Sequence, residues 1–417
     1  MAEYLIRGGN RICGDFTPHG AKNAALPILA ASILTGDENI FHRCPDISDV
    51  SVMKEILCSL GCRIEGKDDS VLVDSRGITC CEVPVRLMKE MRSSVFLAGA
   101  LLARCGKASI SQPGGCSIGR RPIDIHIRAL RKMGVCVEEN ENGVVMNADG
   151  LTGANIVFDY PSVGATENIM MAATRAKGVT VIHNAAREPE ISDLQNYLVK
   201  CGARIHGAGT SKIVIEGKQP MHGCCYEIMA DRIEAGTVLM AAAGTGGSVH
   251  LKGIDTAWLK SCSRFLRYSG CDVIKRASEM WLKAPKRLYP AGKVRTGPYP
   301  GFPTDMQPQF TAIMTTAAGE TRIEETVFEN RFGFTKELIK MGADIEICRR
   351  IAIIKGNGFL YGDRVKAEDL RGGAALVLAG LMAYGETVVE NIGFIERGYC
   401  GFHRELRKLG AEIYRCI

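Results

Sequence analysis

The chain has 417 residues, enough for two or more domains of ordinary size. Its 52 basic and 46 acidic side chains give a formal net charge of +6, without any Lys/Arg block that would mark a nucleic-acid-binding arm. With 46% hydrophobic and 24% charged residues, the composition is that of an ordinary globular chain, and it excludes disordered, collagen-like and low-complexity proteins.

Neither a membrane segment nor a disulfide scaffold is expected. The N-terminal sequence MAEYLIRGGNRICGDF lacks the apolar core of a secretory signal, and the apolar stretches 24–34 and 97–103 are shorter than the roughly 20 residues of a membrane span. The 17 cysteines are odd in number and form no C-x-x-C pair, so we expect most of them to be reduced thiols packed in the core, and we expect no metal site. These features predict a cytoplasmic protein.

In chain order, the predicted elements alternate between helices and short strands. Apolar helices rich in small residues are predicted at 21–34, 95–105, 165–177 and 374–384. Amphipathic helices, with apolar residues at i, i+3 and i+4, are predicted at 124–133 and 404–409. Strands are predicted at 63–66, 108–113, 179–185, 344–347 and 412–415.

A short signature recurs six times: an apolar or small residue, Gly, a small residue, any residue and a β-branched residue. Its glycines lie 68 to 73 residues apart, at Gly61, Gly134, Gly202, Gly270, Gly342 and Gly410. A second glycine, which opens a strand after a helix, recurs every 66 to 72 residues, at Gly36, Gly106, Gly178, Gly247, Gly319 and Gly385. The shared period indicates six α+β units, and we expect each signature Gly to end a helix in the left-handed C′ position.

The six units are expected to form two lobes of three. A unit of about 70 residues is too small to bury a good core alone, and an open array normally carries polar end repeats, which the last unit lacks. We expect residues 21–229 in one lobe and residues 1–20 plus 230–417 in the other, with linkers near Gly20 and Met229 and a cleft between the lobes.

Charged and polar residues recur where the apolar helices begin. Exposed N–H groups at a helix start favour anions, and neighbouring cations favour phosphate or carboxylate groups. The positions are Lys22-Asn23, Arg92-Ser93-Ser94, Ser162-Val163-Gly164, Asp231-Arg232, Asp305, and Asp369 with Arg371; loops add Cys116 with Arg120 and Arg121, Arg187 with Glu188, Arg331 and Arg397. Each alone fits a helix cap or surface ion pair, and Asp369 could simply pair with Arg371. Because basic residues recur at equivalent positions of the six repeats, we instead expect them to bind an anionic substrate.

The loop 112–122 (QPGGCSIGRRP) is the most distinctive segment. Three glycines in a polar loop are typical of a lid that closes over substrate. Cys116 lies in this loop, and the nearby Arg120 and Arg121 favour its reactive thiolate form. We therefore expect Cys116 to be the chemically active thiol, whereas His126 belongs to the following helix.

Seven motifs, spread in order over the chain, resemble those of the UDP-N-acetylglucosamine 1-carboxyvinyltransferases, a family of enolpyruvyl transferases. They are GAKNAALPIL from Gly20, PGGCSIGRRPID from Pro113, SVGATENIM from Ser162, NAAREPEI from Asn184, FPTDMQPQF from Phe302, ETVFENRF from Glu325 and IERGY from Ile395. The resemblance implies a two-lobed inside-out α/β barrel of six βαβαββ-like repeats, three per lobe.

The resemblance also implies a reaction. The enolpyruvyl group of phosphoenolpyruvate passes to the 3-hydroxyl of UDP-GlcNAc and phosphate is released, with no metal or organic cofactor. This is the first committed step of peptidoglycan synthesis, so the resemblance also implies roles in cell-wall biogenesis, cell shape, cell division and the cell cycle, and inhibition by fosfomycin. A monomer or weak oligomer is expected.

Site roles follow from the resemblance, position by position. Cys116 resembles the proton donor, and Asp305 resembles the base at the sugar hydroxyl. The phosphoenolpyruvate-binding set is Lys22, Asn23, Arg121, Arg331, Arg371 and Arg397, of which Lys22 and Arg397 also count as catalytic. The UDP-GlcNAc-binding set is Asn23, Arg92, Arg121, Pro122, Ile123, Asp124, Ile125, Ser162, Val163, Gly164, Asp305 and Val327.

Three positions depart from the family pattern. Many members have Lys in place of Tyr160, His in place of Phe394 and Ser in place of His19. Residues 256–263 (TAWLKSCS) also differ, which suggests a divergent member. Two alternatives stay open: the sister transferase that acts on shikimate 3-phosphate, and a paralogue that binds UDP-GlcNAc without turnover.

Overall fold

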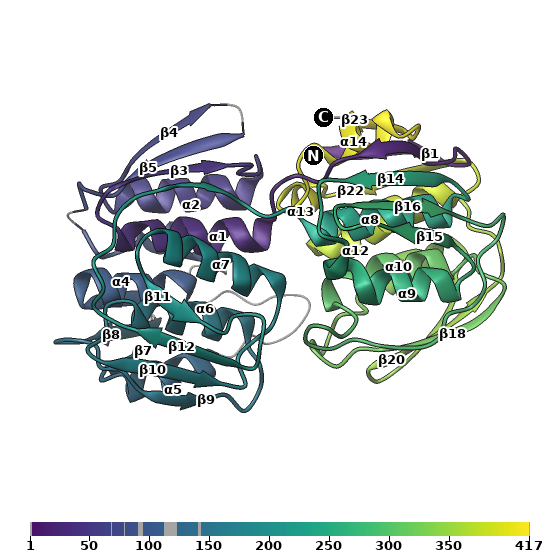
Figure 1. Cartoon of the computed structure of the whole chain (residues 1–417). Coiled ribbons are helices and arrows are strands. Elements are labelled where there is room, and N and C mark those ends of the chain that lie inside the picture. Colours follow the sequence, from purple (N-terminus) through teal and green to yellow (C-terminus); the bar gives the residue numbers. More distant parts are fainter. Residues whose placement is uncertain are drawn as a thin grey trace. The chain divides into compact units, whose positions relative to one another are not determined.

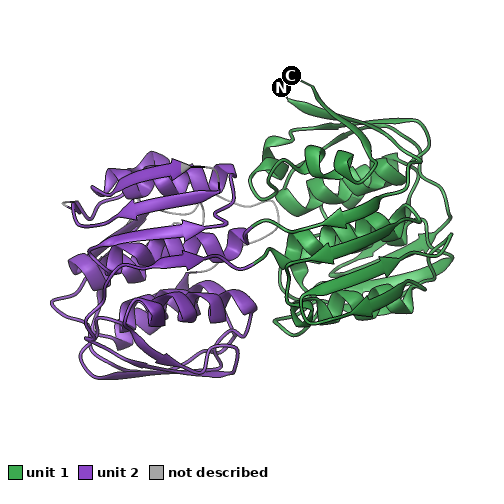
Figure 2. Cartoon of the chain, turned by 45° about the horizontal axis from the view of Figure 1, so that its top comes forward, with its two compact units in different colours: residues 1–19, 116–120, 230–417 green, residues 20–115, 121–229 purple. Residues whose placement is uncertain are grey.

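The structure, a computed structural model, describes residues 2–67, 69–78, 80–90, 95–111, 123–140 and 143–416. These residues form two compact units (Figure 2): unit 1 contains residues 2–19 and 230–416, and unit 2 contains the described residues between 20 and 229. In each unit, the residues where the chain crosses from the other unit are hydrogen-bonded to the residues where it crosses back. In unit 2 Ala21 N–H donates to the Met229 carbonyl (2.7 Å), and in unit 1 Asp231 N–H donates to the His19 carbonyl (2.8 Å).

The described residues of unit 2 form three sheets, with strand orders β13-β3-β5-β4, β11-β12-β10-β9 and β6-β8-β7. The strands are β3 (Glu38–His42), β4 (Arg63–Lys67), β5 (Ser70–Asp74), β6 (Lys107–Ser111), β7 (Cys136–Asn140), β8 (Gly143–Asn147), β9 (Asn155–Val157), β10 (Val179–His183), β11 (Arg204–His206), β12 (Lys212–Glu216) and β13 (Cys225–Glu227). The helices are α1 (Lys22–Ala31), α2 (Ser48–Ser59), α3 (Val85–Glu90), α4 (Leu97–Cys105), α5 (Asp124–Lys132), α6 (Val163–Ala173) and α7 (Pro189–Lys200).

In unit 1 the described residues also form three sheets, ordered β15-β16-β14-β2, β17-β18-β20-β19 and β21-β22-β1-β23. The strands are β1 (Glu3–Arg7), β2 (Cys13–Phe16), β14 (Ser248–Lys252), β15 (Asp272–Lys275), β16 (Glu279–Lys283), β17 (Gly292–Arg295), β18 (Gly319–Glu324), β19 (Asp344–Cys348), β20 (Ile351–Gly356), β21 (Arg364–Lys366), β22 (Glu386–Glu390) and β23 (Glu412–Cys416). The helices are α8 (Arg232–Gly244), α9 (Lys260–Tyr268), α10 (Gln307–Met314), α11 (Thr335–Lys340), α12 (Leu370–Met382), α13 (Gly393–Glu396) and α14 (Phe402–Lys408).

The sheets share one topology, as the repeated sequence predicts. In each four-stranded sheet one edge pair is parallel and the other two pairs are antiparallel, for example β13 with β3, β3 with β5, and β5 with β4. The sheet β6-β8-β7 has the two antiparallel pairs. Strand β1 lies between β22 and β23, so the first residues of the chain complete the sheet of the last repeat.

The predicted apolar helices are the central helices of the units. In each unit the sheets lie on the outside, and helices α1, α4 and α6, or α8, α10 and α12, lie between them (Figure 1). Nearly every residue of α12 is buried, which explains a helix made almost wholly of Ala, Gly, Leu and Val. The amphipathic helices α5 and α14 instead bury only part of their residues.

The signature glycines have the predicted left-handed conformation. Their φ angles lie between 90° and 104°, where L side chains are strained. In the second set of glycines, Gly247 differs because it has no positive φ, whereas the others have φ angles between 63° and 130°. A Cβ at Gly247 would overlap the carbonyl oxygen of Ile12, so this glycine is required by the close approach of β14 to the chain before β2.

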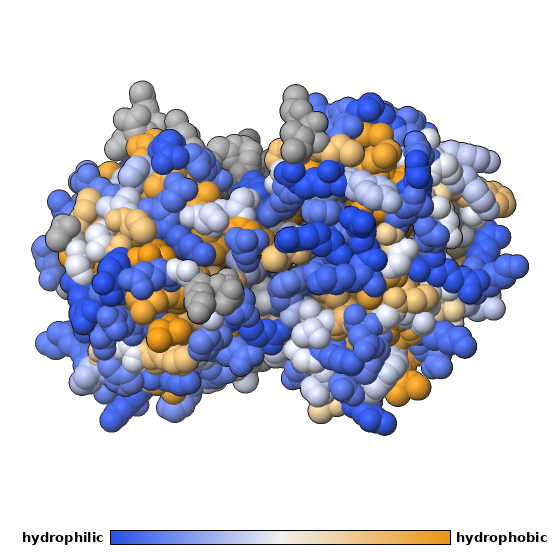
Figure 3. All heavy atoms as spheres, turned by 90° about the horizontal axis from the view of Figure 1, so that it is seen from above, coloured by the Kyte–Doolittle hydropathy of each residue, from blue (hydrophilic) through white to orange (hydrophobic). Residues whose placement is uncertain are grey.

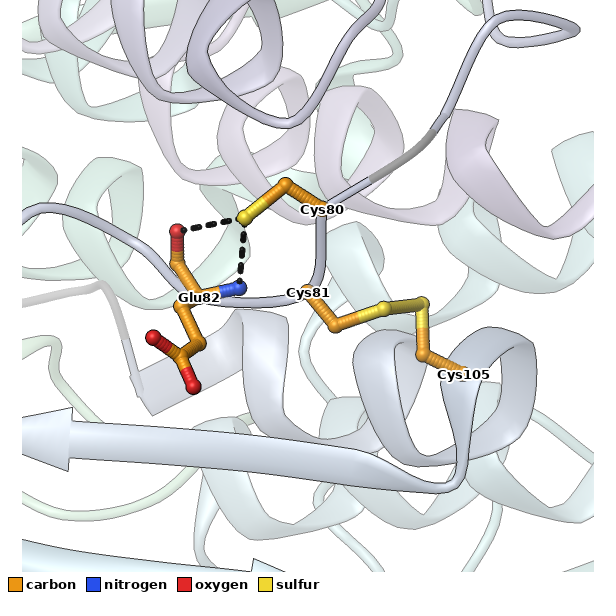
Figure 4. The surroundings of a disulfide bond; sticks show 4 residues. All are labelled: Cys80, Cys81, Glu82 and Cys105. Carbon is orange, nitrogen blue, oxygen red and sulfur yellow. Dashed lines mark hydrogen bonds between the residues drawn. A yellow bond between two sulfur atoms is a disulfide. The ribbon is translucent and has the colours of Figure 1, made fainter.

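The prediction for the cysteines is partly wrong. Cys81 and Cys105 form a disulfide bond beside Cys80, whose sulfur lies 3.4 Å from the backbone nitrogen of Glu82 (Figure 4). Fourteen other described cysteines are free, as expected. Five of those are exposed rather than packed in the core: Cys13, Cys58, Cys136, Cys225 and Cys348. Four of these lie on strands and Cys58 lies on α2; cysteine can occupy such surface positions because its side chain is small and only weakly polar.

No helix among the described residues combines the length and the apolar character that a bilayer crossing requires. Hydrophilic side chains cover most of the face seen in Figure 3, and apolar side chains reach it in separate areas.

Replacing Gly342 by Ala tests the conformational role of the signature. Its φ is +94°, and an added Cβ would make only an ordinary 3.5 Å contact with Tyr361. The free energy lost on substitution therefore comes from the strained backbone conformation alone. We expect Gly342→Ala to destabilise the protein by about 1–2 kcal/mol, seen as a lower Tm in calorimetry. Gly297→Ala is the matched control, because that residue has open space and no positive φ. Equal melting of both variants would contradict this reading.

Candidate functional site

Several predicted site residues lie at the starts of the central helices. Lys22 begins α1, and Ser162, Asp231 and Asp369 are the N-cap residues of α6, α8 and α12. Asp305 lies in the single turn η4 (Thr304–Met306) just before α10. Outside the described residues are Arg92, Cys116, Arg120, Arg121 and Pro122.

In unit 1, Asp305 lies between two arginines. Its Oδ1 is 3.1 Å from Arg331 Nη2, and its Oδ2 is 3.4 Å from Arg371 Nη2. The guanidinium groups are almost fully buried, whereas the Asp305 side chain is 29% exposed. The carboxylate is therefore the part of this cluster that solvent reaches, and the cations behind it hold it in place.

Arg331 also joins two helix starts. Its Nη2 donates to the Thr304 carbonyl (3.1 Å), and its Nη1 lies 3.6 Å from Asp369 Oδ1. The same Asp369 oxygen accepts from the backbone N–H groups of Arg371 and Gly372, both at 3.0 Å. Asp369 is thus a cap that pairs with Arg331, and the alternative pairing of its side chain with the Arg371 guanidinium is not found.

A buried polar network supports Arg371 from behind. Its guanidinium lies over the Tyr399 ring, 5.2 Å from the centroid, and the Tyr399 hydroxyl contacts Thr237 Oγ1 and Gln309 Nε2, both at 2.9 Å. In the described part of the chain, Nε and Nη1 of Arg371 have no hydrogen-bond acceptor. Buried donors without acceptors cost free energy, so this arginine is suited to an anion supplied by a ligand.

Val327 lies in a loop that Glu325 holds. The Glu325 Oε1 accepts from Val327 N–H (2.7 Å) and Phe328 N–H (3.1 Å), and its Oε2 accepts from Thr304 Oγ1 (3.0 Å). The structure therefore connects the predicted nucleotide contact at Val327 with the turn that carries Asp305. Arg397, the remaining predicted residue of unit 1, is half-buried at the C-cap of α13, three residues after the exposed Phe394.

In unit 2, Lys22 forms a short ion pair. Its Nζ lies 2.6 Å from Asp49 Oδ2 at the start of α2, and both side chains are largely buried. Asn23 is the next residue of α1. The Lys22 ammonium is thus held at the helix start, where the backbone dipole already favours an anion.

Apart from Asn23 in α1, the described nucleotide-binding residues predicted in unit 2 lie at the starts of α5 and α6. Ser162 Oγ accepts from Ala165 N–H (3.3 Å), so Ser162 caps α6 ahead of Val163 and Gly164. Half-buried Ile123 and Ile125 flank the exposed Asp124 at the start of α5. Asp124 lies 3.2 Å from Arg128, which also pairs with Asp159 at 2.8 Å, next to the 41% exposed Tyr160.

Sequence reasoning missed two buried polar groups of α6. Glu167 has no hydrogen-bond partner for either carboxylate oxygen in the described chain, and burial, with Glu190 and Glu188 nearby, raises its pKa well above the ordinary value. The Asn168 amide contacts Gly99 N–H (2.6 Å) and His126 Nδ1 (2.8 Å). An acid and an amide inside an otherwise apolar helix were the signals available in the sequence.

His19 also has a role that sequence reasoning missed. Its Nδ1 lies 2.9 Å from Glu234 Oε1, and its backbone N–H donates to Glu234 Oε2 at 2.7 Å. Hydrogen bonds with Cys400 and then with Glu234 raise the pKa of His19 from 6.5 to about 10. The imidazolium therefore neutralises a buried carboxylate on α8.

This pair predicts a pH-dependent stability. Because the folded pKa of about 10 exceeds the ordinary 6.5, the contribution of His19 is complete below pH 6.5 and is lost as the pH rises through 10. We expect His19→Ser to melt below the wild type at pH 6, with a difference that shrinks toward pH 10, in thermal melts at each pH. Because Cys400 and then Glu234 raise the pKa of His19, Cys400→Ala combined with Glu234→Gln should remove most of the pH dependence, and a difference independent of pH would contradict this assignment.

The comparisons with known proteins cover almost the whole chain. The family model described as EPSP synthase (3-phosphoshikimate 1-carboxyvinyltransferase) matches residues 6–406. A UDP-N-acetylglucosamine 1-carboxyvinyltransferase 2 of Caldanaerobacter subterraneus is 48% identical over 417 residues, which is 100% of both chains. A UDP-N-acetylglucosamine 1-carboxyvinyltransferase of Magnetococcus marinus is 44% identical over 100% of this chain and 99% of its own.

Solved structures agree on the fold. The enolpyruvyl transferase NikO from Streptomyces tendae superimposes with a TM-score of 0.90 at 26% identity, covering 99% of this chain and 98% of its own. EPSP synthase from Acinetobacter baumannii superimposes with a TM-score of 0.77 at 18% identity over 100% of both chains, which shows the shared fold alone. The predicted two-lobed α/β fold class is confirmed, and the chain belongs to the enolpyruvyl transferase family, with UDP-N-acetylglucosamine 1-carboxyvinyltransferases as full-length relatives.

Proposed function

We propose that this protein transfers the enolpyruvyl group of phosphoenolpyruvate to the 3-hydroxyl of UDP-N-acetylglucosamine and releases phosphate. The observation that carries the proposal is the Asp305 carboxylate held against two buried guanidinium groups, 3.1 and 3.4 Å away, in a chain whose full-length relatives bear the name of this activity. A carboxylate fixed beside cations suits a reaction that moves a proton next to an anionic substrate.

The reaction proceeds by addition and elimination. The 3-hydroxyl oxygen of the sugar attacks C2 of phosphoenolpyruvate, its proton passes to a base, and an acid adds a proton to C3, which gives a tetrahedral ketal. The bond from C2 to the phosphate oxygen then breaks, C3 loses a proton, and the double bond forms again. Inorganic phosphate and the enolpyruvyl ether are the products.

Residues of unit 1 supply the base and part of the anion site. Asp305 receives the hydroxyl proton, because it is the exposed member of its cluster. Arg331 fixes it, and Arg371 offers a ligand the two donors that the described chain leaves without acceptors. Arg397 joins the phosphoenolpyruvate site, and Val327 contacts the nucleotide sugar.

The remaining roles belong to unit 2 and to loop 112–122. Cys116 is the proton donor, and Lys22, Asn23 and Arg121 bind phosphoenolpyruvate. The nucleotide-sugar contacts are Asn23, Arg92, Arg121, Pro122, Ile123, Asp124, Ile125, Ser162, Val163, Gly164 and Asp305. The sequence divides these roles between a lobe of residues 21–229 and a lobe of residues 1–20 plus 230–417, and we propose that both lobes contribute to one site.

In the cell this activity starts peptidoglycan synthesis. We propose a cytoplasmic enzyme, monomeric or weakly oligomeric, that is needed for cell-wall biogenesis and hence for cell shape and division. The family model's description keeps a second reading, transfer to shikimate 3-phosphate, but the full-length relatives at 44 and 48% identity favour the nucleotide sugar.

A substrate-swap assay tests the proposal. We expect phosphate release from phosphoenolpyruvate with UDP-GlcNAc and none with shikimate 3-phosphate, measured by a phosphate-coupled assay. Release only with shikimate 3-phosphate would establish the sister activity. Binding of UDP-GlcNAc without release at any enzyme concentration would establish a non-catalytic paralogue.

Asp305→Asn tests the base. The amide cannot accept a proton, so we expect kcat to fall by about 10²–10⁴-fold with UDP-GlcNAc still bound. Asp255→Asn makes the same chemical change at a surface helix cap in unit 1, where Asp255 accepts from Ala257 N–H at 2.9 Å. Unchanged turnover in Asp305→Asn would assign the base to another group.

Cys116→Ser tests the reactive thiol. Fosfomycin is an epoxide that resembles phosphoenolpyruvate and alkylates a thiolate, so we expect the variant to escape labelling and to lose turnover. Intact-mass measurement after incubation reads out the adduct. Cys348→Ser, at an exposed cysteine of β19, is the control and should be labelled as the parent protein is. Equal labelling of Cys116→Ser would show that a different cysteine reacts.

A further inference from the structure

Two free thiols of unit 2 lie in van der Waals contact outside the proposed active site. Cys201 is the C-cap residue of α7, and Cys224 directly precedes β13. Their sulfur atoms are 3.4 Å apart, although 23 residues separate them in the chain. A disulfide requires the sulfurs to approach to about 2.05 Å, so a small side-chain movement would join them.

Backbone hydrogen bonds hold both cysteines in this position. The Cys201 carbonyl accepts from His222 N–H (2.9 Å), and the Cys224 carbonyl accepts from Ile40 N–H (3.0 Å). The Cys224 N–H donates to Asn39 Oδ1 (3.3 Å), which also accepts from the Tyr197 hydroxyl (2.9 Å) on α7. The approach of the sulfurs is therefore a property of the packed fold.

The two thiols differ in accessibility and in acidity. Cys201 is fully buried, whereas Cys224 is partly exposed. The contact with Cys201 lowers the pKa of the Cys224 thiol, as do Lys200 and His222, whereas the contact with Cys224 and burial raise the pKa of Cys201. A reachable thiolate beside a buried thiol is the arrangement in which one sulfur attacks and the other resolves.

We propose that Cys201 and Cys224 form a modification site for low-molecular-weight disulfides. The Cys224 thiolate attacks a sulfur of the disulfide RSSR, which gives a mixed disulfide and releases RS⁻. Cys201 sulfur then attacks Cys224 Sγ, the mixed disulfide breaks, and a second RS⁻ leaves. The two thiol protons pass to the leaving thiolates, so the protein loses two hydrogen atoms and two RSH form.

A disulfide between Cys201 and Cys224 would link α7 covalently to residues 224–229, the last residues of unit 2. Asp193 on α7 already accepts from the Tyr226 hydroxyl (2.6 Å) and from Met229 N–H (3.2 Å). A bond between Cys201 and Cys224 would add a covalent link between the same helix and the same segment, and would thereby restrict the unfolded chain. We expect the oxidised protein to melt at a higher temperature than the reduced protein.

The neighbouring Cys225 provides the matched control. It is exposed on β13 and its sulfur lies 3.1 Å from His42 Nε2, away from the Cys201 contact. Trypsin releases Cys201 in the peptide 201–204 (CGAR) and both vicinal cysteines in the peptide 219–232. Serine variants of Cys224 and Cys225 therefore decide which of the two forms the link.

The experiment treats the reduced full-length protein with oxidised glutathione, blocks remaining thiols with iodoacetamide, and maps non-reduced tryptic peptides by mass spectrometry. We expect the peptide 201–204 joined to the peptide 219–232 in the parent and in Cys225→Ser, and its loss in Cys224→Ser. Peptide 201–204 recovered only in alkylated form, or a link that persists in Cys224→Ser, would overturn the proposal.

A double variant tests the order of the steps and the dependence on the native fold. With Cys201→Ser and Cys225→Ser combined, the resolving thiol is absent, so we expect glutathione to remain on Cys224. No glutathione on the peptide 219–232 would overturn the assignment of Cys224 as the attacking thiol. A link that forms no faster in the folded parent than in guanidinium chloride would overturn the role of the structure. None of these readouts depends on the proposed enzymatic activity.

Discussion

A helix that is buried on every side carries its charged residues mainly near its ends, and this constraint governs the placement of most polar groups in both compact units; Glu167, whose pKa burial raises, is the exception inside α6. The central helices α8 and α12 bury almost all of their residues, and the peptide N–H groups of their first turns have no acceptor within the helix itself. Asp231 and Asp369 accept from these N–H groups. Each of these two helices therefore places polar groups at its start, and part of the proposed site lies at such helix starts.

The charged side chains at these helix starts form ion pairs with one another, and some of them share a partner. In unit 1, Arg331 contacts both Asp305 and Asp369, while Arg371 contacts the other oxygen of Asp305. Breaking one member of such a buried set leaves its partner uncompensated, which is costly in a low-dielectric interior. The arrangement thus combines a fixed carboxylate with cations that keep some donors for a ligand, a combination that isolated caps would not produce.

Other buried polar groups, with shifted pKa values or close contacts, lie away from the starts of the central helices. Desolvation keeps His126 neutral, with its pKa lowered to about 4, and the contact between its Nδ1 and Asn168 links α5 to α6. The thiols of Cys201 and Cys224 are brought together by backbone hydrogen bonds of two different elements. In both cases packing, rather than any local motif, sets the reactivity of the side chain.

The sequence by itself determined the repeat, the helix-ending glycines and the family. The period of about 70 residues, the small apolar helices and the long motifs are local patterns, and local patterns are visible without coordinates. The same holds for Lys22, Asp305 and Asp369 as residues of helix starts. The sequence alone also pointed to Cys116, because glycines and arginines surround it.

Only the tertiary structure decided which of these groups touch. The partner of Asp369 is Arg331 rather than Arg371, Lys22 pairs with Asp49, and Cys81 bonds to Cys105 against the expectation of reduced thiols. Strand β1 completes a sheet with β22 and β23, nearly the whole chain away. Such contacts depend on how separate elements pack, and no periodicity along the chain specifies the distance between two side chains that are far apart in it.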